Sequence, residues 1–301
     1  MNFKYKCFLQ RVFSALPRGE QLNYVFQKYV THTLPISDDC FIARVNQAYN
    51  HYLKYTKYAE NQQKGIYYEF GAGWDLVSPV TMSLLGFKKL YCVDIRKLIT
   101  AELIQDTVTK LSKLKSMMPF NCDLGKVDVI TNNNYLIILK KRFGIEYVAP
   151  LDVRHTNFPS NSVDFISSNL TFEHIPKEDV MPILLECHRL LKKGGIFSFT
   201  IDYQDHWSHF DKKISAYNFL QYSDGEWSKY NPSLNFQNRL RHRDYMAMIR
   251  QAGFMVLEEK PILPSEHDVD TLKKMKLESL FSNNYEIEEL GVRAGEIVVK
   301  K

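Results

Sequence analysis

A turn with two glycines and two carboxylates is the first group of residues that could do chemistry. Gly71 and Gly73 follow an apolar run that is typical of a strand, and Glu69 and Asp75 flank them. Glycines in such a turn let the backbone come close to a ligand. A nicotinamide dinucleotide fold would place a further glycine where Leu76 stands, and the flanking carboxylates would repel a pyrophosphate. The turn therefore favours a ligand with a sulfonium or ammonium group and disfavours a nicotinamide-dependent oxidoreductase.

Asp94 is a third carboxylate of this kind. It follows a second apolar run, residues 90–93, and lies 25 residues after Glu69. An acidic residue about 20 residues beyond a glycine turn is expected to accept hydrogen bonds from the hydroxyl groups of a ribose. The turn and Asp94 together predict a nucleoside ligand at the carboxyl ends of two neighbouring strands.

The polar segment after the fifth predicted strand has the densest set of titratable side chains in the chain. An imidazole can take the proton of a hydroxyl nucleophile, and a neighbouring carboxylate can orient the ring. We predict His206 or His209 as a general base, with Asp205 or Asp211 as the orienting carboxylate. His174 is a further candidate for the base. For each histidine the alternative is a purely structural hydrogen bond.

Aromatic residues are concentrated in the same region, with eight Phe, Trp and Tyr residues between positions 203 and 230. Their faces suit a sugar or a planar ring, and they equally suit a lid that excludes water. Asp202 and Asp205 could together hold a divalent metal. The sequence assigns no metal ligands, however, and we expect no metal site.

A sheet with helices on both faces must position these residues. From Gly65 onward short apolar runs alternate with longer amphipathic segments, which indicates parallel strands joined by helices. We predict an α/β fold with a doubly wound, seven-stranded, mostly parallel sheet, including a helix over residues 176–193. Residues 1–63 are predicted to form a helical extension, and residues 64–301 a domain with insertions at about 98–145 and 203–240. The predicted strands are residues 66–70, 90–93, 146–149, 163–167, 196–201, 254–258 and 296–299.

Residues 65–202 resemble the class I S-adenosylmethionine-dependent methyltransferases, in particular the small-molecule type with an E-x-G-x-G motif. The glycine turn and Asp94 are followed, in the family's order, by four further blocks: Leu151 to Val153, Phe158 to Asp164, Ser168 to Ile175 and Leu191 to Gly195. The resemblance implies a Rossmann-like methyltransferase domain over residues 64–301, with S-adenosylmethionine as the methyl donor.

The resemblance also implies roles for single residues. Asp152 would accept a hydrogen bond from the adenine amino group, Val153 would pair through its backbone, and Asn169 would contact the methionine end. The chain departs from the family at Asp75, which takes the place of a third glycine, and in the 58 residues between Asp94 and Asp152. An inserted helical subdomain would explain this interval. The implied cofactor-binding residues are Glu69, Gly71, Ala72, Gly73, Asp94, Ile95, Asp152, Val153, Asn169 and Leu170.

The methyl acceptor follows only by elimination. After Asn169 there is no Pro-Pro-aromatic run that would grip a nucleobase amine, and there is no Pro-Cys pair near the fourth strand for attack on cytosine. A small-molecule or saccharide acceptor is left, and we expect O-methylation by in-line displacement with help from a general base. The alternative is a non-catalytic cofactor-binding protein of the same fold that acts through a partner.

Charge and cysteine usage bear on partners and on location. The net charge of +5 lies mostly in residues 1–30, where Lys4, Lys6, Arg11, Arg18 and Lys28 oppose Glu20 alone. Such a segment could contact a membrane surface, although a helix packed on the domain explains it as well. The excess is too diffuse to predict a nucleic-acid partner. Five cysteines without CxxC spacing, and the absence of any long apolar run, predict a cytoplasmic protein without a membrane span.

Overall fold

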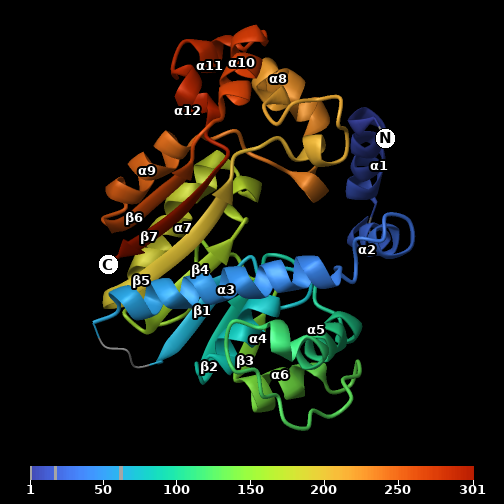
Figure 1. Ribbon diagram of the computed structural model, residues 1–301, viewed down its shortest axis with the longest axis vertical. Coiled ribbons are helices and arrows are strands. Elements are labelled where there is room, and N and C mark those ends of the chain that lie inside the picture. Colours follow the sequence, from blue (N-terminus) through green and yellow to red (C-terminus); the bar gives the residue numbers. More distant parts are fainter. Residues whose placement is uncertain (1, 17–18, 61–63) are drawn as a thin grey trace.

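The computed structural model describes residues 2–16, 19–60 and 64–301. Within them one sheet is formed by β1 (Ile66–Phe70), β2 (Lys89–Val93), β3 (Ile145–Val148), β4 (Val163–Asn169), β5 (Leu191–Asp202), β6 (Met255–Ile262) and β7 (Ala294–Lys300). Their order is β3-β2-β1-β4-β5-β7-β6 (Figure 1). Neighbours from β3 to β5 are parallel, whereas β7 is antiparallel to β5 and β6. The predicted seven-stranded, mostly parallel sheet is confirmed.

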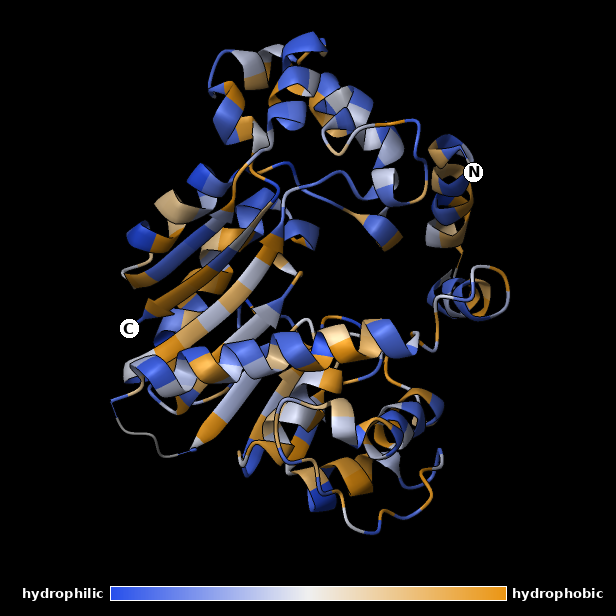
Figure 2. Ribbon diagram, in the orientation of Figure 1, coloured by the Kyte–Doolittle hydropathy of each residue, from blue (hydrophilic) through white to orange (hydrophobic). Residues whose placement is uncertain are grey.

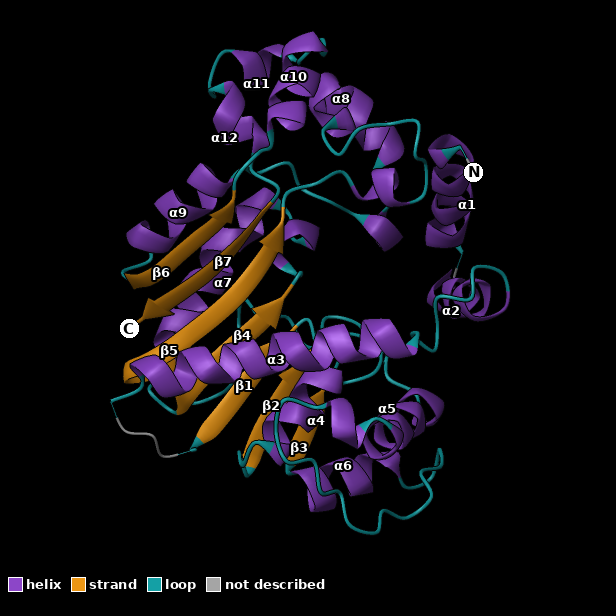
Figure 3. Cartoon of the chain, viewed as in Figure 1, coloured by secondary structure: helices purple, strands orange, loops and turns teal. Residues whose placement is uncertain are grey.

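Helices cover both faces of this sheet. One face packs against α3 (Asp38–Tyr58), α4 (Val77–Leu84), α5 (Ala101–Lys113) and α6 (Tyr135–Phe143), and the other against α7 (Lys177–Leu190) and α9 (His242–Gln251) (Figure 3). Tyr67 packs with the first group and Tyr68 with the second, because successive side chains of a strand point to opposite faces. Hydrophilic and hydrophobic residues mix along α3, which lies with one side on the sheet (Figure 2). The result is a three-layer α/β/α sandwich.

A second body, which we call the helical lobe, lies beyond the ends of β5 and β6 (Figure 1). It contains α1 (Phe3–Ala15), residues 203–240 with α8 (Asp224–Trp227), and residues 263–293 with α10 (Glu266–Lys274), α11 (Ser279–Ser282) and α12 (Ile287–Gly291). These three distant segments share one core, which includes Phe3, Trp207, Phe219, Leu272 and Leu290. Sequence reasoning placed an insertion at 203–240 but did not find that residues 263–293 belong to the same body.

The helix predicted over residues 176–193 is wrong at its C-terminal end. The helix ends at Leu190, and Leu191 already pairs with Val163 of the neighbouring strand. β5 therefore starts five residues earlier than predicted, because strand pairing takes over before the two glycines at 194 and 195. Of the predicted insertion at 98–145, residues 101–113 and 135–143 are α-helical.

The basic residues near the N-terminus make contacts with the rest of the chain. Arg11 donates to two backbone carbonyls of the helical lobe, at 3.0 and 3.2 Å, and Lys28 pairs with Glu102 of α5 at 2.6 Å. Lys28 lies on α2 (Gly19–Tyr29), whose Tyr24 ring stacks on Trp74 with ring centroids 5.4 Å apart. Arg18 and the predicted boundary at residue 63 lie outside the described residues. Among the described helices none is long and apolar enough to span a membrane.

Candidate functional site

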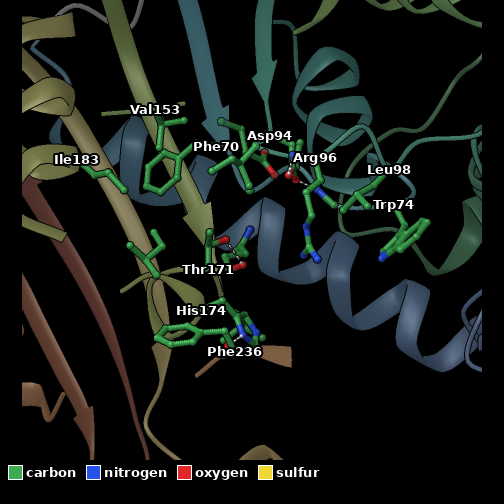
Figure 4. Close-up of a pocket in the computed structure, with 18 of the residues that line it drawn as sticks. Phe70, Trp74, Asp94, Arg96, Leu98, Val153, Thr171, His174, Ile183 and Phe236 are labelled. Carbon is green, nitrogen blue, oxygen red and sulfur yellow. Dashed lines mark hydrogen bonds between the residues drawn. The ribbon is translucent and has the colours of Figure 1, made fainter. Parts of the chain in front are cut away.

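A cavity of about 710 Å³ lies where the sheet order reverses between β1 and β4, at the carboxyl ends of the strands. Its volume is in the range of small-molecule sites, and this position in a doubly wound sheet is where ligands bind. All ten residues predicted to bind the cofactor line it, and so does His174. Figure 4 shows Asp94 and Arg96 on one side of the cavity and His174 and Phe236 on the other.

The glycine turn needs its glycines for conformational reasons. Gly71 and Gly73 have φ angles of 70° and 69°, in the left-handed region that side chains disfavour. A Cβ atom added to Gly71 would lie 2.4 Å from the side chain of Thr171. The backbone N–H of Gly73 donates to Asp94 Oδ2 at 3.1 Å, so a hydrogen bond links the glycine turn to the residue that follows β2.

Asp94 is buried at 6% exposure, and its carboxylate is held by backbone donors alone among the described residues. Oδ1 accepts from the N–H of Arg96 at 2.9 Å, in addition to the bond from Gly73. Burial raises the pKa of Asp94 above its ordinary value. A carboxylate has about four lone-pair sites, so Asp94 keeps acceptor capacity for the hydroxyl groups of a ligand.

Glu69 lies at the cavity wall but is occupied by neighbouring hydroxyl groups. It accepts from Tyr67 Oη and from Ser78 Oγ, the latter at 2.7 Å. Burial raises the pKa of Glu69 to about 7. Next to this group, Asp75 Oδ1 accepts from the first helical N–H of α4, that of Val77, at 3.4 Å.

Arg44 of α3 is a cavity residue that sequence reasoning missed. Its Nη1 lies 2.6 Å from Asp75 Oδ2, and both side chains line the cavity. Arg44 therefore neutralises one of the two carboxylates that flank the glycine turn, and the net negative charge at the turn is smaller than the sequence suggests. No local signal marks Arg44, since its partner lies 31 residues away and the contact depends on how α3 crosses the sheet.

His51 of α3 was also missed, and it fixes the amide of Asn169. Its Nε2 lies 2.5 Å from Asn169 Oδ1 and its Nδ1 lies 2.6 Å from Ser198 Oγ. Burial lowers the pKa of His51 to about 4, so the ring is neutral. A neutral ring can donate from Nε2 to the amide oxygen while Nδ1 accepts from the hydroxyl, which positions Asn169 at the cavity wall.

Asp152 is paired with a neighbour in the chain. The guanidinium of Arg154 approaches its carboxylate with Nη2 at 2.6 Å and Nε at 3.0 Å, and Nη1 of Arg154 also reaches Asp179. Hydrogen bonding by Arg154 lowers the pKa of Asp152 below its ordinary value. Asp152, Val153 and Ile183 all line the cavity.

Three histidines lie together at the lobe side of the cavity. His174 opens onto the cavity, and its Nδ1 lies 2.7 Å from the carbonyl oxygen of Phe236. The His206 ring lies 5.0 Å from that of His174 and 5.6 Å from that of His209, between centroids. Burial, followed by the influence of His206, lowers the pKa of His174 to about 4. His206 and His209 stand behind His174 and do not themselves line the cavity.

The expectation that Asp205 or Asp211 orients these rings is wrong. Asp205 is fully buried and accepts from the N–H of Trp207 and from Asn218 Nδ2, both at 2.9 Å, and burial raises its pKa to about 6. It caps the short 3₁₀ helix His206–His209, and its two carboxylate oxygens are taken up by these bonds to Trp207 and Asn218. Asp211 instead accepts from the N–H of Phe3 at 3.1 Å.

Asp202 is a carboxylate that lies beside two of the rings. Its Oδ2 lies 3.4 Å from Nε2 of His206 and 3.8 Å from Nε2 of His209. Burial raises its pKa, but hydrogen bonding to both histidines outweighs burial and holds the pKa below the ordinary value. The sequence indicated the correct segment, which begins with Asp202 at the end of β5. It could not indicate which carboxylate of the segment lies beside the histidines, because that depends on the turn that follows the strand.

Comparison with known proteins gives one family match. Residues 131–199 match a family model described as a methyltransferase domain, and this stretch includes Asp152, Val153 and Asn169. No curated protein matches the chain.

Solved structures that share similarity are distant. A putative sarcosine dimethylglycine methyltransferase from Galdieria sulphuraria is 15% identical over 86% of this chain and 85% of its own, with a TM-score of 0.46. Geranyl diphosphate C-methyltransferase from Streptomyces coelicolor A3(2) is 13% identical over 87% and 83%, with a TM-score of 0.47. An S-adenosylmethionine dependent methyltransferase from Mesorhizobium loti is 12% identical over 83% and 97%, with a TM-score of 0.44.

Proposed function

We propose that this chain, which carries a class I S-adenosylmethionine-dependent methyltransferase domain, transfers a methyl group to an oxygen atom of a small-molecule or saccharide acceptor. One observation carries the proposal: the residues expected at the cofactor border the same cavity as His174, whose ring lies 5.0 Å from that of His206. A methyl donor at the glycine turn and a hydroxyl acceptor near His174 would therefore meet in one enclosed space.

The donor would lie across the carboxyl ends of β1, β2 and β4. Asp94 would accept from the ribose hydroxyls, because its carboxylate faces the cavity with acceptor capacity to spare. Asp152 and Val153 would receive the adenine. The methionine end would lie along the glycine turn toward Asn169, whose amide His51 holds in place.

The acceptor would enter from the side of the helical lobe, where residues 233–236 complete the cavity wall. In the in-line displacement the acceptor oxygen forms a bond to the methyl carbon, the bond from that carbon to sulfur breaks, and its electron pair stays on sulfur. The hydroxyl proton passes to a base. His174, which lines the cavity, would contact the hydroxyl, and His206, which lies behind His174 and next to Asp202, would take the proton.

Calorimetry and product analysis test this proposal. The protein should bind S-adenosylmethionine and S-adenosylhomocysteine but not NAD. With a panel of sugars and phenols it should release S-adenosylhomocysteine and yield a methyl ether, and the same acceptors with that hydroxyl already methylated should be inert. Binding without turnover on any acceptor would favour the non-catalytic alternative, and transfer to nitrogen or carbon would refute O-methylation.

The histidines have a matched control. His206→Gln should lower the turnover rate by about 10² to 10⁴ while S-adenosylhomocysteine binds as before. His267→Gln, the same change on an exposed residue of α10, should leave the rate unaltered. Equal turnover rates for the two variants would show that His206 takes no part in the reaction.

A further inference from the structure

The histidines belong to a larger group of side chains, and a role in proton transfer does not explain all of its members. We call it the histidine–carboxylate cluster and define it as Glu173, His174, Asp202, His206 and His209. Its members come from the short turn after β4 and from the end of β5 with the turn that follows. The two strands are hydrogen-bonded neighbours, so the sheet itself brings the two turns together.

Glu173 is the member that needs an explanation. Its side chain is 1% exposed, and among the described residues neither carboxylate oxygen has a hydrogen-bond partner. The backbone N–H groups of Glu173 itself and of Asp202 favour the ionised carboxylate, but neither makes a hydrogen bond of acceptable geometry to it. A buried carboxylate without a partner is strongly unfavourable, unless it takes up a proton or a cation compensates its charge.

Two histidines face this carboxylate with suitable donor atoms. One atom each of Glu173, His174 and His206 lies within 4.8 Å of the others. Ligand atoms at 2.0 to 2.2 Å from a common metal are separated by up to about 4.4 Å, so small side-chain rotations would close these three around one ion.

The hydrogen bond of His174 favours metal binding over a merely structural role. Because the carbonyl oxygen of Phe236 can only accept, Nδ1 of His174 must carry the proton, which leaves the lone pair on Nε2. A ligating histidine commonly donates its other ring N–H to a backbone carbonyl in this way, which fixes its tautomer and orientation.

Asp202 and His209 extend the cluster beyond His206. They form a second group with His206, again with one atom each within 4.8 Å. Because His206 is common to both groups, an ion bound by the first would have Asp202 next to it. Glu173 and Asp202 together supply the two negative charges that balance a divalent cation.

We propose that Glu173, His174 and His206 bind one divalent cation, with Asp202 and His209 beside it, at the edge of the cavity that His174 lines. Two imidazoles and a carboxylate suit a transition-type ion such as Zn²⁺, Mn²⁺, Co²⁺ or Fe²⁺, whereas Mg²⁺ and Ca²⁺ prefer oxygen ligands alone. Three protein ligands leave coordination positions open. The ion therefore selects an acceptor that presents an oxygen donor.

This inference rests on the proposed methyl transfer in one respect, the role of the ion. A cation bound to the acceptor oxygen lowers the pKa of its hydroxyl, as metals do for bound water. The proton would then pass to His209, which lies beside Asp202 and is reached by solvent. The oxygen would form its bond to the methyl carbon while the bond from that carbon to sulfur breaks, and the electron pair of the broken bond would stay on sulfur. His206 would act as a ligand and not as the base in that case.

Direct metal binding tests the site without any assay of activity. The full chain is stripped with a chelator, and Co²⁺, Mn²⁺, Zn²⁺ and Mg²⁺ are titrated one at a time by calorimetry. Co²⁺ binding is followed in addition by its visible absorption spectrum. We expect one Co²⁺, Mn²⁺ or Zn²⁺ per chain and much weaker binding of Mg²⁺. Absence of binding at millimolar concentrations would overturn the proposal. Titration of S-adenosylhomocysteine into the same sample shows whether the methyl-donor site binds its ligand even if the metal site does not exist.

Variants assign the ligands. Glu173→Gln keeps the size of the side chain and removes its charge, so it should fold and should bind Co²⁺ at least tenfold more weakly. His174→Ala should do the same, whereas His267→Ala on α10 should bind as the wild type does. If Glu173→Gln binds Co²⁺ unchanged while Asp202→Asn abolishes binding, the ion belongs to Asp202, His206 and His209, and the assignment to Glu173 is overturned. Metal binding without any turnover would uphold the site and count against the methyl transfer.

Discussion

Replacing Asp94 by asparagine is the sharpest single test of how the cavity binds its nucleoside. The carboxylate already accepts two backbone N–H bonds, from Gly73 at 3.1 Å and from Arg96 at 2.9 Å. Asparagine offers one oxygen in place of two, and its NH₂ group faces either a backbone N–H or a ribose hydroxyl. At least one charge-assisted bond to the ribose is therefore lost in the variant.

A hydrogen bond to a charged group contributes about 1.5 to 3 kcal/mol, which corresponds to roughly 10- to 150-fold in the dissociation constant. We expect Asp94→Asn to weaken S-adenosylhomocysteine binding by that factor, measured by isothermal titration calorimetry. Asp128→Asn makes the same chemical change on an exposed loop residue and should bind as the wild type does. A dissociation constant within about threefold of wild type for a folded Asp94→Asn would refute the assignment of Asp94 to the ribose.

Three further predictions concern stability. Because burial raises the pKa of Glu69 from 4.5 to about 7, the folded state holds its proton more tightly than the unfolded state, so this group's stabilisation is complete below pH 4.5 and is lost between about pH 4.5 and 7. Urea unfolding should show that the free energy of unfolding is about 2.5 kcal/mol lower at pH 8 than at pH 5, and that Glu69→Gln largely removes this difference. An equal pH dependence in both proteins would contradict the prediction. Gly71→Ala should lower the melting temperature through about 1 to 2 kcal/mol of left-handed strain and the clash with Thr171, and Thr171→Ala should recover part of the loss; an unaltered melting temperature would disprove the strain. Phe3→Ala should release α1, seen as faster amide exchange over residues 3–15, whereas unchanged exchange would mean that the ring does not anchor the helix.

The strands and the glycine turn could be predicted from the sequence because their signals are local. Apolar runs mark β1 and β2. The positive φ angles at positions 71 and 73 favour glycine, so the residue type itself indicates the turn. Asp94 follows from the same logic, since parallel neighbouring strands must end at one edge. For these residues the sequence was sufficient to predict the arrangement, and the structure adds the distances.

Other site residues could not be predicted because they act across the fold. Arg44 and His51 lie on α3 and meet partners 31 and 118 residues away, and no periodicity marks which residues of a helix will face a cavity. The choice between Asp202 and Asp205 depended on a 3₁₀ turn that uses Asp205 as its cap. Glu173 likewise meets a residue far away in the sequence, since its backbone carbonyl accepts from the N–H of Asn238 at 2.7 Å.

The distribution of the three tryptophans gives the protein two optical reporters. Trp74 lines the cavity and stacks on Tyr24, whereas Trp207 and Trp227 are buried at 1% and 4% exposure in the core of the helical lobe. Indole emission shifts with the polarity around the ring, so Trp207→Phe combined with Trp227→Phe would leave a fluorophore that senses cavity occupancy. Trp74→Phe would leave the pair that senses whether the lobe stays folded, and the two events could then be followed separately in real time.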